Sequence, residues 1–391
     1  MLKKIALKLL LHKWKRGGFN VVFWDGEQES YGDEAPAFTI TFKQEPPLRI
    51  GSDDAVLLLG EAYMDGILEI EGSMDEVLRV VFLNSPPGAN AADKKANAQS
   101  DSAAQQRNIH HHYDLGNDFF KLWLDETMSY SCAYFKTPDD SLTQAQLQKI
   151  DHILKKINLR PGDRLLDIGS GWGWLIIKAA QQYQVQATGI TLSTEQYQGT
   201  RQRIRELGLE QQVDIQLVNY QDFEASQPCF DKIVSIGMFE HAGRENLAKY
   251  MRKVSDLLVP GGVSLVHTIT GMFEETSNAW IGKYIFPGGY VPSLRETVWL
   301  LPQFDFHLLH AESLRLHYAM TLDRWYKNFA GQLSAVRAKY DERFIRMWSL
   351  YLRGCAAAFR VSGLDVYQLL FTKGLNNDLP LTYRHLYHDA I

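Results

Sequence analysis

Cysteine is scarce in this chain of 391 residues, which holds only Cys132, Cys229 and Cys355. The three positions lie far apart and their number is odd. They therefore predict neither a disulfide framework nor the paired spacing of a structural zinc site. Free thiols of this kind are usual in reducing compartments, so we expect a cytoplasmic protein without a metal site.

Charge of one sign and long apolar runs are also lacking. The net charge is only -5, whereas a nucleic-acid-binding protein needs a basic field to attract phosphates, so no nucleic-acid partner is expected. The apolar run from Ile5 to Leu11 is interrupted by Lys8. It is too short to span a bilayer, and no small-residue cleavage site follows it. The hydrophobic fraction of 45% still predicts a sizeable core.

The first sixteen residues have the pattern of a basic amphipathic helix. Its apolar face is formed by Leu2, Ile5, Ala6 and Leu9, and its charge comes from Lys3, Lys4, Lys8, Lys15 and Arg16. Such a helix can lie on an anionic membrane surface. The same pattern is typical of a helix packed on its own domain, so both interpretations stay open.

Two folded units joined by a linker are predicted. In residues 1–83, Asp25-Gly26 separates two runs like a hairpin turn, AFTITF and ILEIEG alternate like half-buried strands, and SMDEVLRVVF indicates a helix capped by Ser73. This is a small α+β unit. Residues 84–106 are rich in Ala, Asn, Ser and Gln and form the linker. Residues 107–391 form the second unit.

The second unit alternates helices and strands from about residue 140. Strands are expected at RLLDI, VQATGITLS, QVDIQLV, FDKIVSIG and GGVSLVHTIT, with helical patterns before and between them. This alternation predicts an α/β fold with a doubly wound, mostly parallel sheet. The stretch 321–359 is helical, and apolar and aromatic enough to line an acyl tunnel, although it could equally cap a soluble protein.

A glycine turn follows the first of these strands. Gly169, Gly171 and Gly173 leave room for a ligand to approach the backbone, and the helix that follows offers its positive N-terminal end. The spacing G-S-G-W-G differs from the G-x-G-x-x-G of dinucleotide-binding dehydrogenases. Together with the loop in LLVPGGVSLV, it favours a methyltransferase that uses S-adenosylmethionine over a nicotinamide enzyme.

A specific resemblance now appears. HYDLGNDFF, YSCAYF, LLDIGSGWGW, GITLSTEQ, IVSIGMFEH, LVHTI and KYIFPGG resemble the cyclopropane-fatty-acyl-phospholipid synthases and their relatives, the mycolic acid cyclopropane synthases. The resemblance spans about residues 107–380. It implies a Rossmann-like class I methyltransferase with a helical acyl-binding cap, while residues 1–83 are similar to the extra domain of the bacterial phospholipid enzymes. Ser170 departs from the cysteine usual in the family's glycine turn, and we expect no loss of cofactor binding from it.

The resemblance implies a set of residues that bind S-adenosylmethionine. They are Tyr130, Ser131, Leu165, Leu166, Asp167, Ile168, Gly169, Ser170, Gly171, Trp172, Gly173, Thr191, Leu192, Gln196, Tyr220 and Gln221. Thr191, Leu192 and Gln196 are expected toward the ribose and methionine. Tyr220 and Gln221 are expected beside the adenine, where the mycolic acid enzymes tend to have tryptophan. No acidic residue directly ends the second strand, although Glu195 is near.

The resemblance also implies a bicarbonate ion that acts as a base. Its holders match Cys132, Glu240, His267, Tyr318 and, through its backbone, Ile269. A glutamate cannot donate when ionised, so Glu240 either orients His267 or shares a proton with the ion. Cys355 matches a recurrent family cysteine as well. Methyl transfer to an alkene needs no covalent nucleophile, and the flanking AAAF favours a structural role in a helix core.

The aromatic stretch 110–135 would cover the cofactor. We expect Phe119, Phe120, Leu122 and Trp123 to pack a helix on the sheet, and Tyr130, Ser131 and Cys132 to face the reaction. An alkene methylated in a dry pocket becomes a carbocation, which aromatic faces stabilise.

The implied reaction moves a methylene group from S-adenosylmethionine to the cis double bond of an unsaturated phospholipid. The family further implies a homodimer that is peripheral on the inner face of the cell membrane. Two other classes stay open: a methyltransferase that makes a methyl-branched lipid or methylates a small amine, and a lipid-binding protein without catalysis. The sequence does not fix head group, chain length or double-bond position.

Overall fold

The computed structural model describes residues 2–47, 55–85, 115–225, 229–276, 278–287 and 289–387. Most of the predicted linker and the histidines at the start of the aromatic stretch lie outside these residues. Within them, no helix is long and apolar enough to cross a membrane.

The N-terminal unit is a four-stranded sheet with three helices, an α+β unit as the sequence predicts, although the second of these helices was not predicted. The elements are α1 (Leu2–Leu11), β1 (Gly18–Val22), β2 (Gln28–Gly32), β3 (Phe38–Phe42), α2 (Ala55–Met64), β4 (Leu68–Gly72) and α3 (Met74–Asn84), and the strand order is β2-β1-β3-β4. The hairpin at Asp25-Gly26 is confirmed, since β1 and β2 pair antiparallel. The Ser73 cap is confirmed too, because its hydroxyl accepts a hydrogen bond from the Asp75 amide at 3.2 Å.

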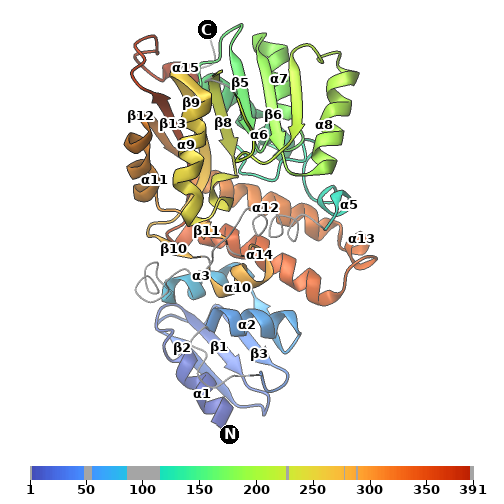
Figure 1. The fold of residues 1–391 in the computed structure, drawn as a ribbon. Helices are drawn as coiled ribbons and strands as arrows, with labels where there is room; N and C mark the ends of the chain where they lie inside the picture. The colour runs from blue at the N-terminus through green and yellow to red at the C-terminus, as the bar shows by residue number, and fades with distance from the viewer. Residues whose placement is uncertain are drawn as a thin grey trace.

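Helix α1 is packed on its own domain, one of the two interpretations that its sequence left open, and binding to a membrane surface stays a prediction. Leu7 and Leu11 are fully buried in the core of the N-terminal unit. The expected apolar face turns outward instead, and its large members stay exposed: Leu2 by 76%, Ile5 by 50% and Leu9 by 63%. The helix is therefore packed on its own domain along one side (Figure 1) and presents an apolar stripe along another.

The lysines of α1 form ion pairs with acidic residues of the same unit. Lys8 pairs with Glu29 at 2.9 Å and with Glu27 at 2.5 Å. Lys4 pairs with Asp25 at 2.5 Å and also with Glu27. These lysines contribute less free charge to a membrane surface than the sequence alone suggests.

The second unit is built on a seven-stranded sheet with the order β12-β13-β9-β8-β5-β6-β7. Strands β5 (Arg164–Ile168), β6 (Gln186–Thr191), β7 (Val213–Leu217), β8 (Phe230–Ile236) and β9 (Leu258–Thr270) run parallel, as predicted. Helices α6 (Leu142–Lys156), α7 (Trp174–Tyr183), α8 (Thr194–Glu206) and α9 (Leu247–Leu257) flank them. The doubly wound α/β prediction is confirmed. The antiparallel strands β12 (Phe306–Ser313) and β13 (Asp365–Lys373) were not predicted.

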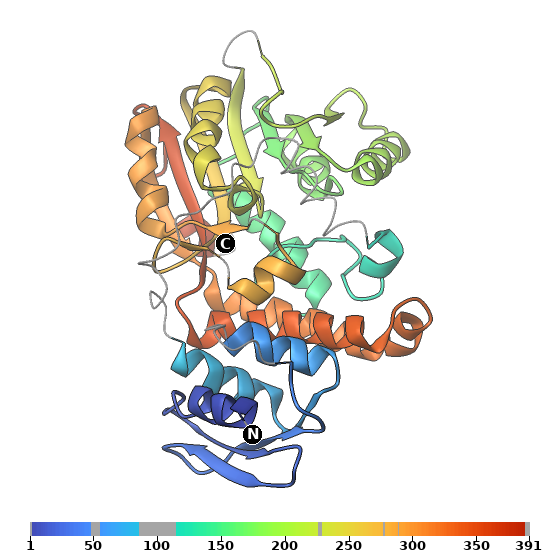
Figure 2. The same ribbon diagram turned by 60° about the horizontal axis from the view of Figure 1, so that its bottom comes forward.

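The remaining elements surround the sheet, and most of them lie at its end that faces the N-terminal unit (Figure 1). They are α5 (Asn117–Phe120), η1 (Phe239–His241), η2 (Arg244–Asn246), β10 (Glu275–Thr276), α10 (Ala279–Tyr284), β11 (Tyr290–Val291), α11 (Leu294–Leu300), η3 (Leu301–Phe304), α12 (Arg315–Gly331), α13 (Leu333–Arg337), α14 (Glu342–Val361) and α15 (Arg384–Tyr387). Figures 1 and 2 show α12 and α14 lying between the sheet and the N-terminal unit. The predicted helical cap thus also forms the surface on which the N-terminal unit packs.

Candidate active site

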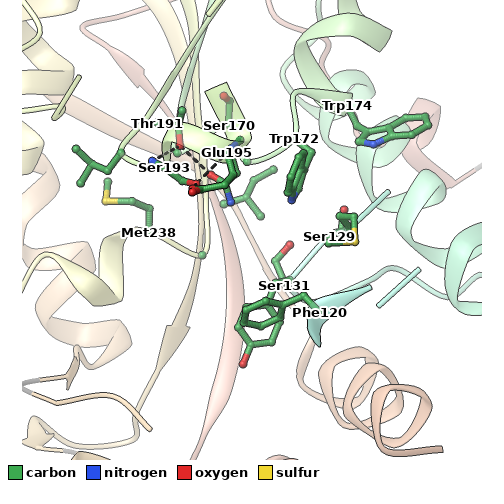
Figure 3. Close-up of a pocket in the computed structure, with 18 of the residues that line it drawn as sticks. Phe120, Ser129, Ser131, Ser170, Trp172, Trp174, Thr191, Ser193, Glu195 and Met238 are labelled. Atoms are coloured by element: carbon green, nitrogen blue, oxygen red, sulfur yellow. Dashed lines mark hydrogen bonds between the residues drawn. The ribbon is translucent and has the colours of Figure 1, made fainter. Parts of the chain in front are cut away.

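A cavity of about 800 Å³ lies at the carboxyl ends of β5, β6, β7 and β8. This is the edge at which open α/β sheets bind ligands. Figure 3 shows Ser131 and Phe120 on one side of the cavity, with Thr191, Ser193 and Glu195 across from them. The cavity therefore has one wall from the aromatic stretch and one from the sheet.

The glycine turn after β5 forms part of the sheet wall. Gly169, Gly171 and Gly173 have φ of +84°, +55° and +75°, a backbone region that side chains with a Cβ rarely adopt. A Cβ on Gly171 would point into open space, so this glycine serves the backbone conformation and leaves room in the cavity. A Cβ on Gly173 would lie 2.3 Å from Thr200 Cγ2, so this glycine allows α7 to pack against α8.

Most residues predicted to bind the cofactor line this cavity: Tyr130, Ser131, Asp167, Ile168, Gly169, Ser170, Gly171, Trp172, Thr191, Leu192, Gln196 and Tyr220. Leu165, Leu166, Gly173 and Gln221 do not. Leu165 and Leu166 are buried in the hydrophobic cores on opposite faces of the sheet, because successive strand side chains alternate. Gln221 donates its amide to the Tyr220 hydroxyl at 3.1 Å.

Polar groups at the end of β6 are held in fixed orientations. Thr191 Oγ1 donates to Gln196 Oε1 at 2.8 Å, which leaves the Gln196 amide nitrogen as a donor. Ser193 Oγ donates to Glu195 Oε2 at 3.0 Å, and Glu195 also lines the cavity. An acidic side chain is therefore present on this wall although the strand itself does not end in one.

The wall opposite is tied to helix α6. Gln146 Nε2 donates to the Ser131 carbonyl at 2.9 Å, and Lys149 Nζ donates to Ser131 Oγ at 2.8 Å. Both α6 side chains are buried and stand one turn apart. They fix the position of Ser131 and with it the backbone of Tyr130.

Two oppositely charged residues at this end of the cavity are poorly solvated. Burial raises the pKa of Asp167 to about 7, although Lys149 opposes the shift. Burial lowers the pKa of Lys149 to about 8, although Asp125, Cys132 and Asp167 oppose the shift. No partner for Asp167 Oδ1 is found among the described residues.

His267 is held by a chain of contacts that fixes its protonation. Lys156 Nζ lies 2.6 Å from Gln368 Oε1, and an ammonium can only donate. The amide nitrogen of Gln368 therefore faces His267 Nδ1, at 3.3 Å, and donates to it. His267 then carries its proton on Nε2, an atom that is buried and without a partner in the described part of the chain.

The charge state of His267 agrees with this assignment. Burial lowers the pKa of the imidazole well below its usual value, and the nearby Lys149 and Lys156 lower it further. The ring is neutral near pH 7. It therefore presents a single N–H donor from Nε2.

Glu240 contacts the residue next to His267 rather than His267 itself. Its Oε2 accepts a hydrogen bond from Thr268 Oγ1 at 2.7 Å. Thr268 faces the side of β9 opposite to His267 and Ile269, since strand side chains alternate. Two roles were expected for Glu240. This geometry does not provide the first of them, in which Glu240 orients His267 directly.

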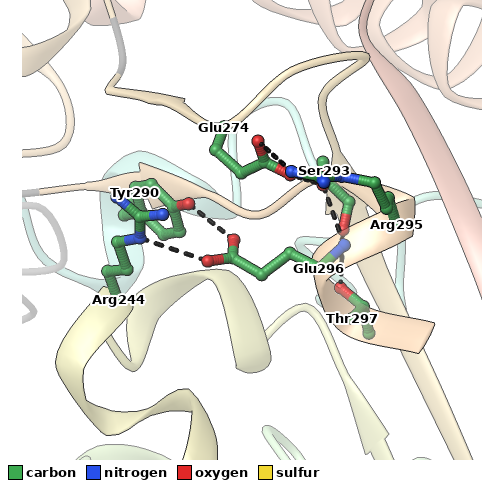
Figure 4. A network of polar contacts seen from close by, with 7 residues as sticks. All are labelled: Arg244, Glu274, Tyr290, Ser293, Arg295, Glu296 and Thr297. Atoms are coloured by element: carbon green, nitrogen blue, oxygen red, sulfur yellow. Dashed lines mark hydrogen bonds and ion pairs between the residues drawn. The ribbon is translucent and has the colours of Figure 1, made fainter. Parts of the chain in front are cut away.

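A polar network holds the turn after Glu240 against the segment that follows β9 (Figure 4). Glu296 accepts from Arg244 Nε at 3.1 Å and from the Tyr290 hydroxyl at 2.5 Å. Glu274 accepts from Arg295 and from Ser293 Oγ, which also caps α11. This network fixes the loop that carries Glu240.

Tyr318 lies near several of the other predicted catalytic residues. Burial raises the pKa of its hydroxyl well above the usual value, and Tyr130, Cys132, Glu240 and Cys355 are close enough to raise it further. Ile269 packs against the same apolar cluster as Cys132. The structure thus brings Cys132, Glu240, Ile269 and Tyr318 to one region, with His267 two residues before Ile269 on the same face of β9.

Neither cysteine of this region has the surroundings of a nucleophile. Cys132 is buried, burial raises the pKa of its thiol, and its Sγ donates to the Ala133 carbonyl at 3.2 Å. Burial raises the pKa of Cys355 to about 12. A reactive cysteine needs a lowered pKa, so both are neutral thiols.

The aromatic stretch packs on α12 and α14 rather than on the sheet, which corrects the expectation from the sequence. Phe119 and Trp123 are fully buried, and Phe119 meets Trp348 of α14 with ring centroids 5.0 Å apart. Phe120 belongs to this apolar packing and also lines the cavity. Tyr130 continues this cluster, with its hydroxyl 2.7 Å from that of Tyr351.

The sequence interpretation missed several polar residues at the site: Gln146, Lys149, Lys156, Thr268, Tyr351 and Gln368. One signal was available for those on α6. Gln146 and Lys149 stand at helical spacing with Ile150 and Ile153 on the buried face, where a polar side chain needs a polar partner. For Gln368 no such signal exists, because β13 was not predicted.

Comparison with known proteins identifies the family. The family model for mycolic acid cyclopropane synthetase matches residues 100–369, and a domain of unknown function matches residues 6–91. A probable fatty acid methyltransferase of Pseudomonas putida is 38% identical over 383 residues, covering 93% of this chain and 95% of the relative. The cyclopropane-fatty-acyl-phospholipid synthase of Escherichia coli K12 is 39% identical over 335 residues, covering 82% and 84%.

A solved structure gives the same result. Mycolic acid cyclopropane synthase CmaA1, complexed with S-adenosylhomocysteine and CTAB, is 37% identical and superposes with a TM-score of 0.63, covering 68% of this chain and 98% of the other. S-adenosylhomocysteine is what S-adenosylmethionine becomes after methyl transfer. The chain therefore belongs to the mycolic acid cyclopropane synthetase family and is an S-adenosylmethionine-dependent methyltransferase with a Rossmann-like fold.

Proposed function

We propose that this enzyme transfers a methylene group from S-adenosylmethionine to the cis double bond of an unsaturated phospholipid acyl chain, forming a cyclopropane fatty acid. The observation that carries the proposal is the position of Tyr130. It lines the cofactor cavity and also packs against the apolar cluster formed with α12 and α14. An acyl chain in that cluster would meet the cofactor beside Tyr130, in a dry site where proximity supplies much of the rate.

The residues present fit the cofactor. The glycine turn leaves the cavity open, Asp167 has an unpartnered carboxyl oxygen among the described residues, and Gln196 offers a free donor. We assign Thr191, Gln196 and Tyr220 to the nucleoside part, and the turn with Ser131 to the methionine part. When bound, S-adenosylmethionine supplies an electrophilic methyl group on a sulfonium.

Aromatic side chains suit the positive charge that forms on the methylated alkene. Tyr130 lies with its ring centroid 5.1 Å from Trp325, and Tyr318 lies 6.0 Å from the same tryptophan. Their π faces attract a cation. Burial raises the pKa of both Tyr318 and Tyr351, so these phenols stay neutral and do not trap the cation as phenolates.

We propose further that bicarbonate, held by Cys132, Glu240, His267, Ile269 and Tyr318, is the base that takes the proton from the added methyl group. The unpartnered Nε2–H of His267 fits an anion, since it is a buried donor. The hydroxyl of Tyr318 is a second donor. Glu240, held by Thr268, would share a proton with the ion.

The substrate class and the apolar stripe of α1 support peripheral membrane binding. Leu2, Ile5 and Leu9 are exposed on one helix whose other side is packed on the domain. We propose that residues 1–83 dock the enzyme on the inner face of the cell membrane, that residues 107–391 form the catalytic domain, and that the enzyme is a homodimer. A phospholipid chain then needs to leave the bilayer only in part.

The experiment combines product analysis with a bicarbonate titration. Liposomes of cis-unsaturated phospholipid are incubated with the enzyme and labelled S-adenosylmethionine, and the fatty acids are identified by mass and by gas chromatography. We expect cyclopropane products, with a rate that falls when carbon dioxide is excluded and recovers with added bicarbonate. Glu240→Gln should lower turnover by roughly two to four orders of magnitude, as for loss of a general base, and respond much less to bicarbonate.

Each part of the proposal has its own contrary result. A wild-type rate that does not depend on bicarbonate would require another base. A saturated product with a methyl branch would favour the second candidate function, which the similarity to a probable fatty acid methyltransferase supports. Methylation of small amines, with no change in the lipid, would overturn the lipid substrate altogether.

A further inference from the structure

A buried ammonium group borders the cofactor cavity without a carboxylate partner. Lys149 is only 3% exposed and lines the cavity. Among the described residues its hydrogen bond goes to Ser131 Oγ, a neutral group, at 2.8 Å. No carboxylate lies within ion-pairing distance of it in the described part of the chain, although buried lysines are almost always paired.

Two other lysines differ from Lys149 because each has an acidic partner. Lys339 pairs with Asp118 at 3.4 Å, and both side chains are more than half exposed. On α6 itself, Lys156 is equally buried but has Glu312 and Gln368 as partners. Lys149 is therefore the buried cation of the cavity wall for which no described residue supplies a carboxylate at ion-pairing distance.

The acidic neighbours of Lys149 do not fill this role. Asp125 accepts from the Thr127 amide at 3.0 Å, and burial raises its pKa. Asp167 is also buried, with its pKa raised to about 7, so part of its population is uncharged at neutral pH. Burial raises the pKa of Cys132, so its thiol is neutral and supplies no negative charge to Lys149. A ligand anion is the remaining counter-charge.

We propose that Lys149 is the counter-ion of the α-carboxylate of S-adenosylmethionine, which it binds together with the Ser131 hydroxyl. The assignment rests on the cofactor orientation proposed above, with the nucleoside toward Thr191 and Tyr220. The methionine part then reaches the opposite wall, where Ser131 stands (Figure 3). Asp167 lies at this same end of the cavity, so a carboxyl and an ammonium flank the place where a zwitterionic amino acid would lie.

The test compares two ligands on three proteins by calorimetry. The ligands are S-adenosylhomocysteine and S-adenosyl-3-thiopropylamine, which keeps the amino group but lacks the carboxylate. The proteins are the wild type, Lys149→Met, and Lys156→Met as a control of equal burial on the same helix. For Lys149→Met we expect S-adenosylhomocysteine to bind roughly 10- to 100-fold more weakly, the scale of a charged hydrogen bond. The decarboxylated ligand should change less than twofold.

Lys156→Met should leave the affinity for both ligands within about threefold of the wild type. Lys149→Arg should keep part of the preference for the carboxylate, because it keeps the charge. Should Lys149→Met fail to fold, the wild type alone still decides: it must bind S-adenosylhomocysteine at least about tenfold better than the decarboxylated ligand.

Three results would overturn the proposal. Equal losses for both ligands would mean that Lys149 only holds the Ser131 segment in place. Unchanged affinity for S-adenosylhomocysteine, with loss of the bicarbonate response in turnover, would assign Lys149 to the free anion. Equal wild-type affinities for the two ligands would remove the carboxylate site. Because these readouts are binding constants, they are independent of whether the lipid product is a cyclopropane.

Discussion

At the scale of single residues, the state of His267 follows from which atoms can donate. Lys156 has no acceptor, so it selects the carbonyl oxygen of Gln368, and the amide nitrogen of Gln368 then selects Nδ1 of His267 as acceptor. Two contacts remote from the reacting atoms thus place the imidazole proton on Nε2. Gln368 and Lys156 are positioning residues in this view.

Replacing Gln368 tests this chain of contacts. In the wild type, nitrogen-15 spectra should show His267 as a single neutral tautomer with Nδ1 unprotonated. Gln368→Leu removes the donor that selects this tautomer, so both tautomers should appear. Turnover should fall by roughly tenfold or more, toward the effect of losing one oriented donor, while the affinity for S-adenosylhomocysteine stays unchanged.

His267→Gln serves to assign the signal among the histidines, of which the chain has 12. A wild-type spectrum with Nδ1 protonated would contradict the deduced orientation of Gln368. A loss of cofactor affinity in Gln368→Leu would instead indicate general damage to the sheet.

The residues that sequence reasoning found and missed differ in one physical respect. The glycine turn is visible in the sequence because its backbone requires glycine at fixed spacing, whatever packs around it. Lys149 and Gln368 carry ordinary side chains, and their roles arise only from partners 18 and 101 residues away in the chain. Their assignment needed the tertiary structure.

At the scale of elements, helix α1 has two apolar sides, of which one is buried and the other is exposed. Leu7 and Leu11 bind the helix to the N-terminal core, whereas Leu2, Ile5 and Leu9 face solvent. Deleting the whole helix would remove core residues, so its effect on membrane binding would be confounded with unfolding. Point substitutions on the exposed stripe separate the two tasks.

The combined variant Leu2→Ser, Ile5→Ser, Leu9→Ser should weaken binding to liposomes. Burying leucine-sized side chains is worth about 1.5–3 kcal/mol each when complete, so partial insertion of three predicts a loss of roughly tenfold or more. The free energy of unfolding and the affinity for S-adenosylhomocysteine should stay within error of the wild type. Sedimentation with anionic liposomes measures the binding.

Leu7→Ala is the matched control on the buried side of α1. It should destabilise the protein by about 2–5 kcal/mol through an internal cavity. Unchanged liposome binding by the triple serine variant would assign α1 to folding alone.

Sequence patterns predicted the parallel strands better than the antiparallel ones. The strands β5 and β8 contain short apolar runs, as buried parallel strands usually do, and β5 is followed by the glycine turn. Strand β12 reads FHLLHAES, and its polar residues interrupt the apolar run because much of the strand is exposed at the sheet edge. Its partner β13 follows a long helix, and its place between β12 and β9 is set by tertiary pairing.

At the scale of the whole molecule, the N-terminal unit contacts the helices that border the active site. Arg343, Arg346 and Arg353 of α14 pair with Asp65, Glu69 and Asp75 of the N-terminal unit. Figure 2 shows α2 and α3 lying along α14. The same cap helices line the apolar cluster at Tyr130, so the proposed membrane-docking unit and the proposed acyl site share one set of elements.

Helix α10 also connects the N-terminal unit to the second unit. Trp280 is buried, and its Nε1 donates to the sulfur of Met64 at 3.3 Å. Gly60 of α2 packs directly on the same indole. Just after α10, Phe286 lies with its ring centroid 5.6 Å from His241 and 5.9 Å from Tyr351. A shift of Trp280 would therefore reach the site through a few packed rings.

Gly60→Ala tests this connection with the smallest possible change. A Cβ at Gly60 would lie 2.5 Å from Trp280 Cδ1, closer than packed atoms approach, so the indole must move. Although alanine favours helices over glycine, we expect a loss of about 1–3 kcal/mol in the free energy of unfolding from overpacking. Turnover on unsaturated liposomes should fall several-fold, while S-adenosylhomocysteine binds as in the wild type, because the cofactor cavity does not include α10.

Gly354→Ala is the matched control, because it lies on α14 at the same interface. A Cβ there would meet Leu78 Cδ2 at 3.9 Å, an ordinary contact. It should stabilise the protein by about 0.5–1 kcal/mol and leave turnover unchanged. Equal effects of the two substitutions would show that helix propensity, and not the Trp280 contact, governs this interface. A fall in cofactor affinity with Gly60→Ala would place the coupling in the cofactor cavity instead of the lipid side.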